Sequence, residues 1–330
     1  MEKVKKAVIF FIYSISVLVT LCSILSIFWD TEIRHLKMLD FPRIQFFLIS
    51  LASLILMMMI VKITSWYDYL IIFALLIALA VNGIYLINYT PLVPVKVLDI
   101  NEDVSGNEFS LLLINVKMSN RNASDLIQLI DAKKPDLILA METDTWWDGQ
   151  LNVLKAPYPY SQHTINEVAY GMVFYSKFPL KSVKVNYIIN KKVPSFDVIV
   201  SLSNDKYFNL NCLHPVPPTH YKDLPDNAGQ KETALQAIGK KIKKSKIPAI
   251  VAGDLNDVVW GNVDQLTETT NLLFDIRVGR GFYNSYNAEN MLMRWPLDHV
   301  YVTKEFKLKK LERLTNIGSD HFPIYVELVL

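Results

Sequence analysis

The sequence Gly318-Ser319-Asp320-His321-Phe322-Pro323 stands directly before a final apolar run, residues 324–330. An acid and an imidazole therefore lie side by side where a buried strand is expected to begin. Three earlier segments also place polar residues at the edge of an apolar run: Met141-Glu142-Thr143, Gly253-Asp254-Leu255-Asn256 and Pro296-Leu297-Asp298-His299. We expect a fold that brings these four strand ends together.

The composition is that of a chain with a membrane part and a globular part. Hydrophobic residues make up 51% of the 330 residues, and mean hydropathy is +0.22. The apolar excess is concentrated in roughly the first 90 residues, as in membrane-spanning sequences. The net charge of +2 gives no electrostatic support for a bulk nucleic-acid binder. Cys22 and Cys212 do not resemble a disulfide pair and do not indicate a redox compartment.

Three N-terminal segments are each long enough to cross a membrane, which takes roughly 20 residues. They lie at about residues 7–29, 44–63 and 67–89. A cleaved signal peptide would have a shorter apolar region, followed by a small-residue cleavage site. We therefore expect residues 1–95 to hold three transmembrane helices, followed by a linker at 96–106.

The charges around the first span indicate a topology. The lysine-rich start favours a cytoplasmic N-terminus, and three spans would then place the large domain outside. The first loop argues in the other direction, because it carries Arg34, Lys37 and Arg43. We expect the domain outside the membrane.

The remainder of the chain, residues 107–330, alternates between strand-like and helix-like segments. Strands outnumber helices and often follow one another directly, which excludes a simple doubly wound parallel sheet. Two mixed sheets stacked face to face with helices outside, an α/β (α+β) sandwich, fit better. The expected strands are about 109–116, 136–141, 169–176, 180–189, 196–202, 207–213, 249–253, near 300, 306–314 and 322–330, with helices after Asn122 and at about 227–244.

The polar residues at the strand ends have the chemistry of a metal-assisted reaction. Glu142, Asp254 and Asp320 are hard oxygen donors, which suit Mg²⁺ or Mn²⁺ better than structural zinc. A divalent cation held by a few carboxylates keeps water ligands and binds substrate phosphate. His214 and His321 would complete the set for proton transfer and charge stabilisation.

These motifs, taken in order, resemble the endonuclease/exonuclease/phosphatase superfamily over roughly residues 107–330. The order is Asn115, Glu142, His214, Gly253-Asp254-Leu255-Asn256, Leu297-Asp298-His299 and Ser319-Asp320-His321. The resemblance implies a four-layer α/β sandwich. With its N-terminal spans, the chain is similar to the bacterial membrane-anchored branch, which includes glycopeptide-resistance-associated members. This implies a multi-pass protein of the bacterial cell membrane, and the topology expected from the lysine-rich start would make its catalytic domain extracytoplasmic.

The resemblance also implies a metal site. Glu142 would be the principal ligand of Mg²⁺ or Mn²⁺, with Asn115 and Asp320 close by. One departure stands out, because some family members carry a further carboxylate two residues after the asparagine and this chain has Lys117. The substitution weakens the case for a second tightly held metal.

Five further residues receive catalytic roles from the same resemblance. Asp254 and Asn256 would orient the attacking water and hold the phosphate. His321 would contact the phosphate, with Asp298 fixing its ring, and His214 would be a second phosphate-facing histidine.

Other candidate residues have simpler interpretations. Asp144 and Asp257 are typical turn or helix-cap residues, and His163 and His220 lie in polar loops. His299 alternates to the opposite strand face from Asp298, which favours a structural role.

Two residue groups have more than one reading. The tryptophans could line the pocket, pack loops or touch the membrane surface: Trp146, Trp147, Trp260 and Trp295. The lysines at residues 240–246 are typical of a solvated helix end, although anionic lipid or nucleic acid could also bind there.

We therefore expect a membrane-anchored, divalent-metal-dependent phosphoesterase that hydrolyses a phosphodiester or phosphomonoester. The anchor favours the lipid bilayer as partner and a lipid-linked substrate. One alternative is a metal-dependent nuclease acting on DNA or RNA, which the near-neutral charge disfavours. A second is a non-catalytic binding module of the cell envelope.

Overall fold

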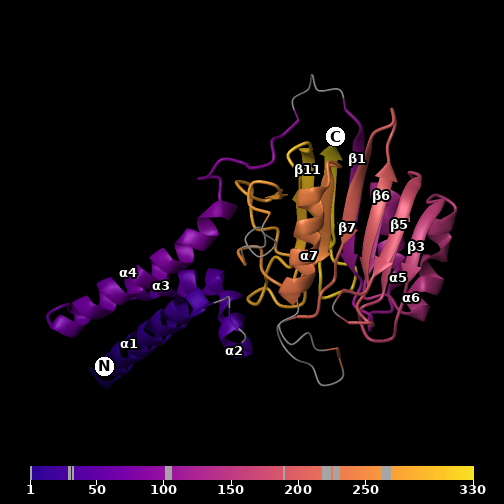
Figure 1. The fold of residues 1–330 in the computed structure, drawn as a ribbon. Helices are drawn as coiled ribbons and strands as arrows, with labels where there is room; N and C mark the ends of the chain where they lie inside the picture. Colours follow the sequence, from indigo (N-terminus) through magenta and orange to yellow (C-terminus); the bar gives the residue numbers. More distant parts are fainter. Residues whose placement is uncertain are drawn as a thin grey trace. The chain divides into compact units, whose positions relative to one another are not determined.

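The computed structural model describes residues 2–28, 31, 33–100, 106–188, 190–217, 224–225, 231–261 and 269–330. Trp29, His220 and residues 227–230 of the expected second helix lie outside these ranges. The chain divides into two compact units, Met1–Val93 and Pro94–Leu330 (Figure 1).

The first unit contains three helices that are long and apolar enough to cross a membrane. Phe10, Met59 and Phe73 are among the large apolar side chains that face outward, as in helices solvated by lipid. Polar groups lie inside, where the amide of Asn82 donates to Ser23 Oγ at 2.9 Å. The helices are α1 (Glu2–Leu25), α2 (Arg34–Lys37), α3 (Arg43–Ile60) and α4 (Trp66–Leu86), with 3₁₀ turns at Ser26–Phe28, Met38–Asp40 and Ile87–Tyr89.

The second unit is built on two six-stranded mixed sheets. The first sheet has the order β11-β12-β1-β2-β4-β3, in which only β1 and β2 are parallel. Its strands are β1 (Glu108–Asn115), β2 (Leu137–Met141), β3 (Tyr160–Thr164), β4 (Met172–Ser176), β11 (Lys307–Arg313) and β12 (Ile324–Val329).

The second sheet repeats this plan with one central parallel pair. Its order is β5-β6-β7-β8-β10-β9, and only β7 and β8 are parallel. Its strands are β5 (Leu180–Asn186), β6 (Ser195–Ser201), β7 (Tyr207–Cys212), β8 (Ala249–Asp254), β9 (Phe274–Asp275) and β10 (Asp298–Val302).

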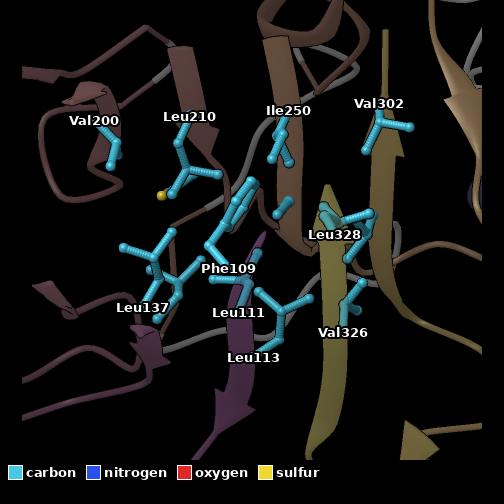
Figure 2. Packing of buried hydrophobic residues seen from close by; sticks show 14 of the residues in the cluster. Phe109, Leu111, Leu113, Leu137, Val200, Leu210, Ile250, Val302, Val326 and Leu328 are labelled. Atoms are coloured by element: carbon cyan, nitrogen blue, oxygen red, sulfur yellow. The ribbon is translucent and has the colours of Figure 1, made fainter. Parts of the chain in front are cut away.

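The main core lies between the two sheets. Side chains alternate along β1, so Leu111 and Leu113 enter this core while Leu112 and Ile114 enter a second cluster on the outer face. Figure 2 shows residues of β1 and β12 packed with Leu210 and other residues of the second sheet. Burial on both faces explains why these strands are nearly continuous apolar runs.

Helices cover the outer faces of both sheets (Figure 1). Helices α5 (Ala123–Lys133) and α6 (Thr145–Leu151), followed by a 3₁₀ turn at Asn152–Lys155, pack on the first sheet. Helix α7 (Lys231–Lys244) packs on the second. The four-layer α/β sandwich expected from the sequence is therefore confirmed.

Several short elements escaped the sequence analysis for physical reasons. Strand β3 is a half-exposed edge strand with a polar sequence, so it has no apolar alternation. Helix α6 has only 7 residues and β9 only 2, too few for a periodic pattern. The strand expected from 169 begins at Met172, because Ala169 has a φ of 62° and turns the chain.

Part of the expected 96–106 linker packs on the second unit. Val97 is buried in the main core, and the backbone N–H of Ile100 donates to the carbonyl of Leu308 at 3.0 Å.

Candidate active site

The candidate active site lies where the two central parallel pairs end. Asn115 is the last residue of β1, and Glu142 follows the end of β2. Asp254 ends β8 in the other sheet, and His214 follows β7. Parallel neighbours end at the same sheet edge, where open sheets commonly place ligand sites.

The antiparallel neighbours return to the same edge. Asp298 begins β10 and stands directly opposite Asp254 in the strand register. His321 lies three residues before the start of β12, which pairs with β1. Residues separated by about two hundred positions in sequence are thereby brought into one cluster.

Asn115 joins the two sheets at the centre of the cluster. Its Nδ2 donates to Glu142 Oε1 at 2.8 Å and to Asp254 Oδ2 at 3.0 Å. Its Oδ1 accepts from the backbone N–H of Lys117 at 3.0 Å, and Glu142 Oε2 accepts from that of Met118 at 3.3 Å. Two carboxylates from different sheets therefore share one amide.

Two histidines face the same Asp254 carboxylate. Nε2 of His321 lies 3.5 Å from Asp254 Oδ2, and Nε2 of His214 lies 3.7 Å from it. The other ring nitrogen of His321, Nδ1, contacts Asp298 Oδ2 at 2.8 Å. Side-chain donor atoms of Asp254, Asp298 and His321 all lie within 4.8 Å of one another, a spacing that could hold a metal ion.

Burial and charge distribute the protons in this cluster. Burial raises the pKa of both Glu142 and Asp254 above the ordinary carboxyl range. Burial alone would also raise the pKa of Asp298, but the charge and hydrogen bond of His321 lower it. Burial lowers the pKa of His214 and favours its neutral form.

His321 has the opposite state from His214. Burial alone would lower the pKa of His321, but the charges of Asp254 and Asp298 raise it to about 10. The ring is therefore a buried imidazolium at neutral pH. One charged and one neutral histidine then face the same carboxylate.

The backbone is held in unusual conformations beside these groups. Glu142 and Asn256 have φ values of 60° and 51°, in the left-handed region that residues with a side chain rarely adopt. Gly253 has a φ of 144°, and an added Cβ would lie 1.9 Å from the carbonyl oxygen of Leu213. The surrounding fold must hold these conformations, as is common at functional sites.

Asn256 connects the ends of β7 and β8. Its backbone N–H donates to Asp254 Oδ1 at 2.8 Å, and its Nδ2 donates to the carbonyl of Pro215 at 2.8 Å. The amide is therefore fixed against the segment that carries His214.

Asp320 lies at the half-exposed rim of the cluster. Its Oδ2 is 3.7 Å from Nζ of Lys117, and the same ammonium group contacts Glu289 Oε1 at 2.8 Å. Lys117 thus places a positive charge beside Asp320. This arrangement agrees with the interpretation that the lysine disfavours a second metal ion.

Comparison with known proteins identifies the family. A model of the endonuclease/exonuclease/phosphatase family matches residues 112–321, which contain every residue of the cluster. The chain belongs to this family. Comparison of the sequence with curated proteins finds no match.

Similar solved structures share the family's fold. TDP2 from D. rerio, in a complex with a single-strand DNA product, has 15% identity and a TM-score of 0.56, covering 68% of this chain and 99% of that one. The human Nocturnin catalytic domain with bound sulfate has 15% identity and a TM-score of 0.53, covering 67% and 93%. A family protein from Bacteroides thetaiotaomicron has 16% identity and a TM-score of 0.52, covering 69% and 99%.

Two serines position the cluster of this endonuclease/exonuclease/phosphatase domain and were missed in the sequence. Ser319 Oγ donates to the carbonyl of Asn115 at 2.7 Å and accepts from the backbone N–H of His321 at 3.1 Å. Ser285 Oγ accepts from the backbone N–H groups of Leu297 and Asp298 at 3.2 and 3.1 Å. Ser319 lies in the quoted motif, whereas no sequence signal distinguishes Ser285.

Asp144, His299 and His163, for which the sequence indicated roles outside the active site, have defined positions in the structure. Asp144 caps α6 by accepting from the backbone N–H of Trp147 at 2.9 Å. His299 contacts the Tyr301 hydroxyl at 2.8 Å and the Asp257 carbonyl at 2.7 Å, which confirms its structural role. His163 lies in β3 and not in a loop. The prediction was wrong because β3 is a polar edge strand, which has no apolar pattern in the sequence.

The tryptophans mainly pack the fold. Trp147, Trp260 and Trp295 are buried, and the half-buried Trp146 lies under the Arg121 guanidinium at 4.9 Å. The packing interpretation fits these residues better than an exposed aromatic ring around the pocket.

Proposed function

We propose that the protein is a membrane-anchored, divalent-metal-dependent phosphoesterase that hydrolyses a phosphodiester or phosphomonoester linked to lipid. The observation that carries the proposal is the cluster joined by Asn115, in which Glu142, Asp254 and His321 from different strand ends meet. Family membership supports hydrolysis of a phosphate ester. The three apolar helices support a substrate held at the bilayer.

The donor set fits a hard divalent cation. Burial raises the pKa of Glu142 and Asp254, and a bound cation would favour the charged form of both carboxylates. Glu142 would be the principal ligand, with Asn115 and Asp320 beside it. In the observed orientation, Asn115 Nδ2 faces both carboxylates, so ligation through Oδ1 would require the amide to turn over. When bound, the cation supplies charge that polarises phosphate and lowers the pKa of water.

The protein's own groups would handle the water and its proton. Asp254 orients the attacking water and takes its proton, a role for which a raised pKa is suited. Asn256, fixed to Pro215, holds the Asp254 carboxylate through its backbone N–H. The water oxygen forms the new bond to phosphorus as the bond to the leaving oxygen breaks. The leaving oxygen takes a proton from solvent water, and Asp254 afterwards returns its proton to solvent.

The histidines would stabilise the charge that develops on the phosphate. His321 is a charged donor whose Nε2 faces the Asp254 side of the site, while Asp298 fixes its Nδ1. His214 is the second phosphate-facing ring, and its buried Nδ1 has no hydrogen-bond partner among the described residues. Buried donors aimed at a developing charge are worth several kcal/mol, about 2.7–4 for one oxyanion donor.

We also propose that the protein lies in the bacterial cell membrane with its catalytic unit on the outer side. The lysines before the first span support this topology, and Arg34, Lys37 and Arg43 in the first loop oppose it. Protease accessibility of the second unit in intact cells and in inverted vesicles would test the orientation.

The function is tested with the purified full-length chain. We expect it to cleave a generic phosphodiester or phosphomonoester only when Mg²⁺ or Mn²⁺ is present, and to act on members of a panel of lipid phosphates and lipid pyrophosphates. Glu142→Gln should abolish this activity, whereas Glu305→Gln, at an exposed loop acid, should not. No hydrolysis of any substrate with either ion would contradict the proposal.

A nuclease is the second candidate, because one similar structure holds a single-strand DNA product. The net charge of +2 argues against it. Cleavage of plasmid or single strands, with a steep loss at higher salt, would favour this candidate over the lipid substrate. Failure to bind Mn²⁺ in a calorimetric titration would instead favour a non-catalytic envelope module.

A further inference from the structure

A loop at the rim of the active site presents three consecutive apolar side chains to the outside. The exposed fractions are 78% for Met291, 76% for Leu292 and 46% for Met293. Within the described part of Pro94–Leu330, no other three consecutive large apolar residues are exposed in this way. Exposed apolar patches on soluble domains commonly mark interaction sites.

The loop is an ordered turn that holds these side chains outward. At its base the backbone N–H of Tyr286 donates to the carbonyl of Trp295 at 2.9 Å, and Trp295 is buried. At its tip the side-chain oxygen of Asn290 accepts from the backbone N–H groups of Leu292 and Met293 at 3.0 and 3.2 Å. A side-chain oxygen that accepts from N–H groups two and three residues on stabilises a turn.

The base of the loop is attached to the active site. The backbone of Tyr286 forms an isolated antiparallel β-bridge with that of His321, and the centroids of the two rings lie 4.9 Å apart. The backbone N–H of Ala288 donates to the carbonyl of Asp320 at 2.7 Å. The base of the apolar loop is therefore anchored beside the catalytic histidine.

Two arginines lie beside the loop on the same rim. The guanidinium groups of Arg294 and Arg313 lie 4.8 and 4.5 Å from the ring of Phe322, the residue after His321. Arg294 Nε donates to the carbonyl of Asn287 at 3.0 Å, and Arg313 Nη1 donates to a backbone carbonyl at 2.9 Å. Among the described residues neither forms an ion pair with a carboxylate. Burial and the charge of Arg294 lower the pKa of Arg313, consistent with an uncompensated pair of cations.

We propose that the tip Met291–Met293 enters the apolar layer of a bilayer while Arg294 and Arg313 bind anionic headgroups at its surface. An apolar edge flanked by cations is the composition of segments that lie in a lipid interface. Unbranched, flexible methionines suit a contact with disordered acyl chains. The inference deepens the proposed function and rests on it, since it supplies the contact through which the site would reach a lipid-linked phosphate.

The test measures the depth of a probe in full-length protein reconstituted in bilayer nanodiscs. A fluorescent label is placed at Leu292→Cys in a Cys22→Ser background, where the remaining Cys212 is buried. The matched control carries the label at Val153→Cys, which is 59% exposed and lies beyond the end of α6. Quenching by lipids with a spin label on the acyl chain reports contact with the apolar layer.

We expect quenching at position 292 to be at least about twofold greater than at 153, because only the loop enters the lipid. Adding anionic lipid should increase the quenching at 292, since each cation strengthens attraction to such a surface roughly fivefold. The increase should disappear in the double variant Arg294→Gln, Arg313→Gln. Thermal melting of each labelled variant verifies that the fold is intact.

Equal, weak quenching at both positions in both lipid compositions would overturn the proposal. It would also be overturned if the label at 292 were shielded only at high protein-to-lipid ratio and without lipid quenching, because a second copy of the chain would then cover the tip. Quenching does not require hydrolysis. Strong quenching at 292 in an inactive protein would support the membrane contact and reject the hydrolase. Hydrolysis without quenching at 292 would support the hydrolase and reject the membrane contact.

Discussion

Replacing Asp298 by Asn tests the proton distribution on which the proposed mechanism depends. Asp298 contacts Nδ1 of His321 at 2.8 Å, and both side chains are buried. Asn keeps the size of the side chain and removes its charge. Asp254 and Asp298 are the two carboxylates that raise the pKa of His321 most. With Asp298 neutralised, only Asp254 of this pair remains charged, so we expect His321 to lose its proton more easily.

The expected size of the effect follows from the pKa of His321, about 10 in place of the ordinary 6.5. The difference corresponds to about 5 kcal/mol in favour of the charged ring in the folded protein. Because the folded-state pKa is raised, this stability is fully present below pH 6.5 and is lost as the pH rises towards 10. Loss of one neighbouring carboxylate should lower the pKa by about 1–3 units.

The measurement is an NMR titration of the histidine rings in metal-free protein kept in chelator. His321 should titrate near pH 10 in the parent chain. In Asp298→Asn the pKa of His321 should be lower by about 1–3 units. The alkaline fall of kcat/KM should move to lower pH in parallel, because a neutral His321 stabilises phosphate charge less well.

The control is Asp144→Asn, which removes a buried carboxylate from the cap of α6. It should cost at most about 1 kcal/mol of stability, because Asn also caps helices well and only the half-exposed ion pair with Arg121 is lost, and it should leave the His321 titration unchanged. An unchanged His321 titration in folded Asp298→Asn would refute the reasoning. So would an equal displacement in the Asp144 variant, which would mark an indirect effect of lost stability.

Three further changes have defined expected outcomes. Glu142→Gln should lower kcat more than about a hundredfold with little change in melting temperature, since Gln can keep the bond to Asn115; comparable losses of stability and activity would point to a structural residue. Gly253→Ala should destabilise the protein severely, because its Cβ would lie 1.9 Å from a carbonyl oxygen. The matched change Gly149→Ala has open space and should stabilise α6 by up to about 1 kcal/mol. Equal melting temperatures of the two variants would contradict this prediction. Lys117→Asp should increase the number of Mn²⁺ ions bound in calorimetry, because a carboxylate replaces the ammonium group 3.7 Å from Asp320; unchanged stoichiometry would argue against a metal-excluding lysine.

Much of the fold could be predicted because its signals are local. Strands β1, β2 and β8 are buried on both faces and are therefore continuous apolar runs. Such runs can be located from the local sequence, without knowledge of the strands beside them. The polar edge strand β3 could not be found in this way. Its residues satisfy their backbone groups by pairing with β4, a contact that has no sequence signal.

The candidate site shows the same division. Asp254 and His321 stand in short motifs at strand ends and could be identified from residue type and position. Their states could not, because the raised pKa of His321 depends on Asp298 opposite Asp254 in the register of β8 and β10. Ser285 is a similar case, since its role is a contact made by folding alone.

The sequence by itself determined the two-part organisation, the layered α/β class and the residue types available for phosphate chemistry. These depend on apolar run length and on which side chains stand at strand ends. Only the tertiary structure decided that one amide of Asn115 joins carboxylates from two sheets, that His321 is charged while His214 is neutral, and that an apolar loop stands beside them. The physical reason is that burial and proximity set hydrogen bonds and charge states, and both arise only when distant segments pack together.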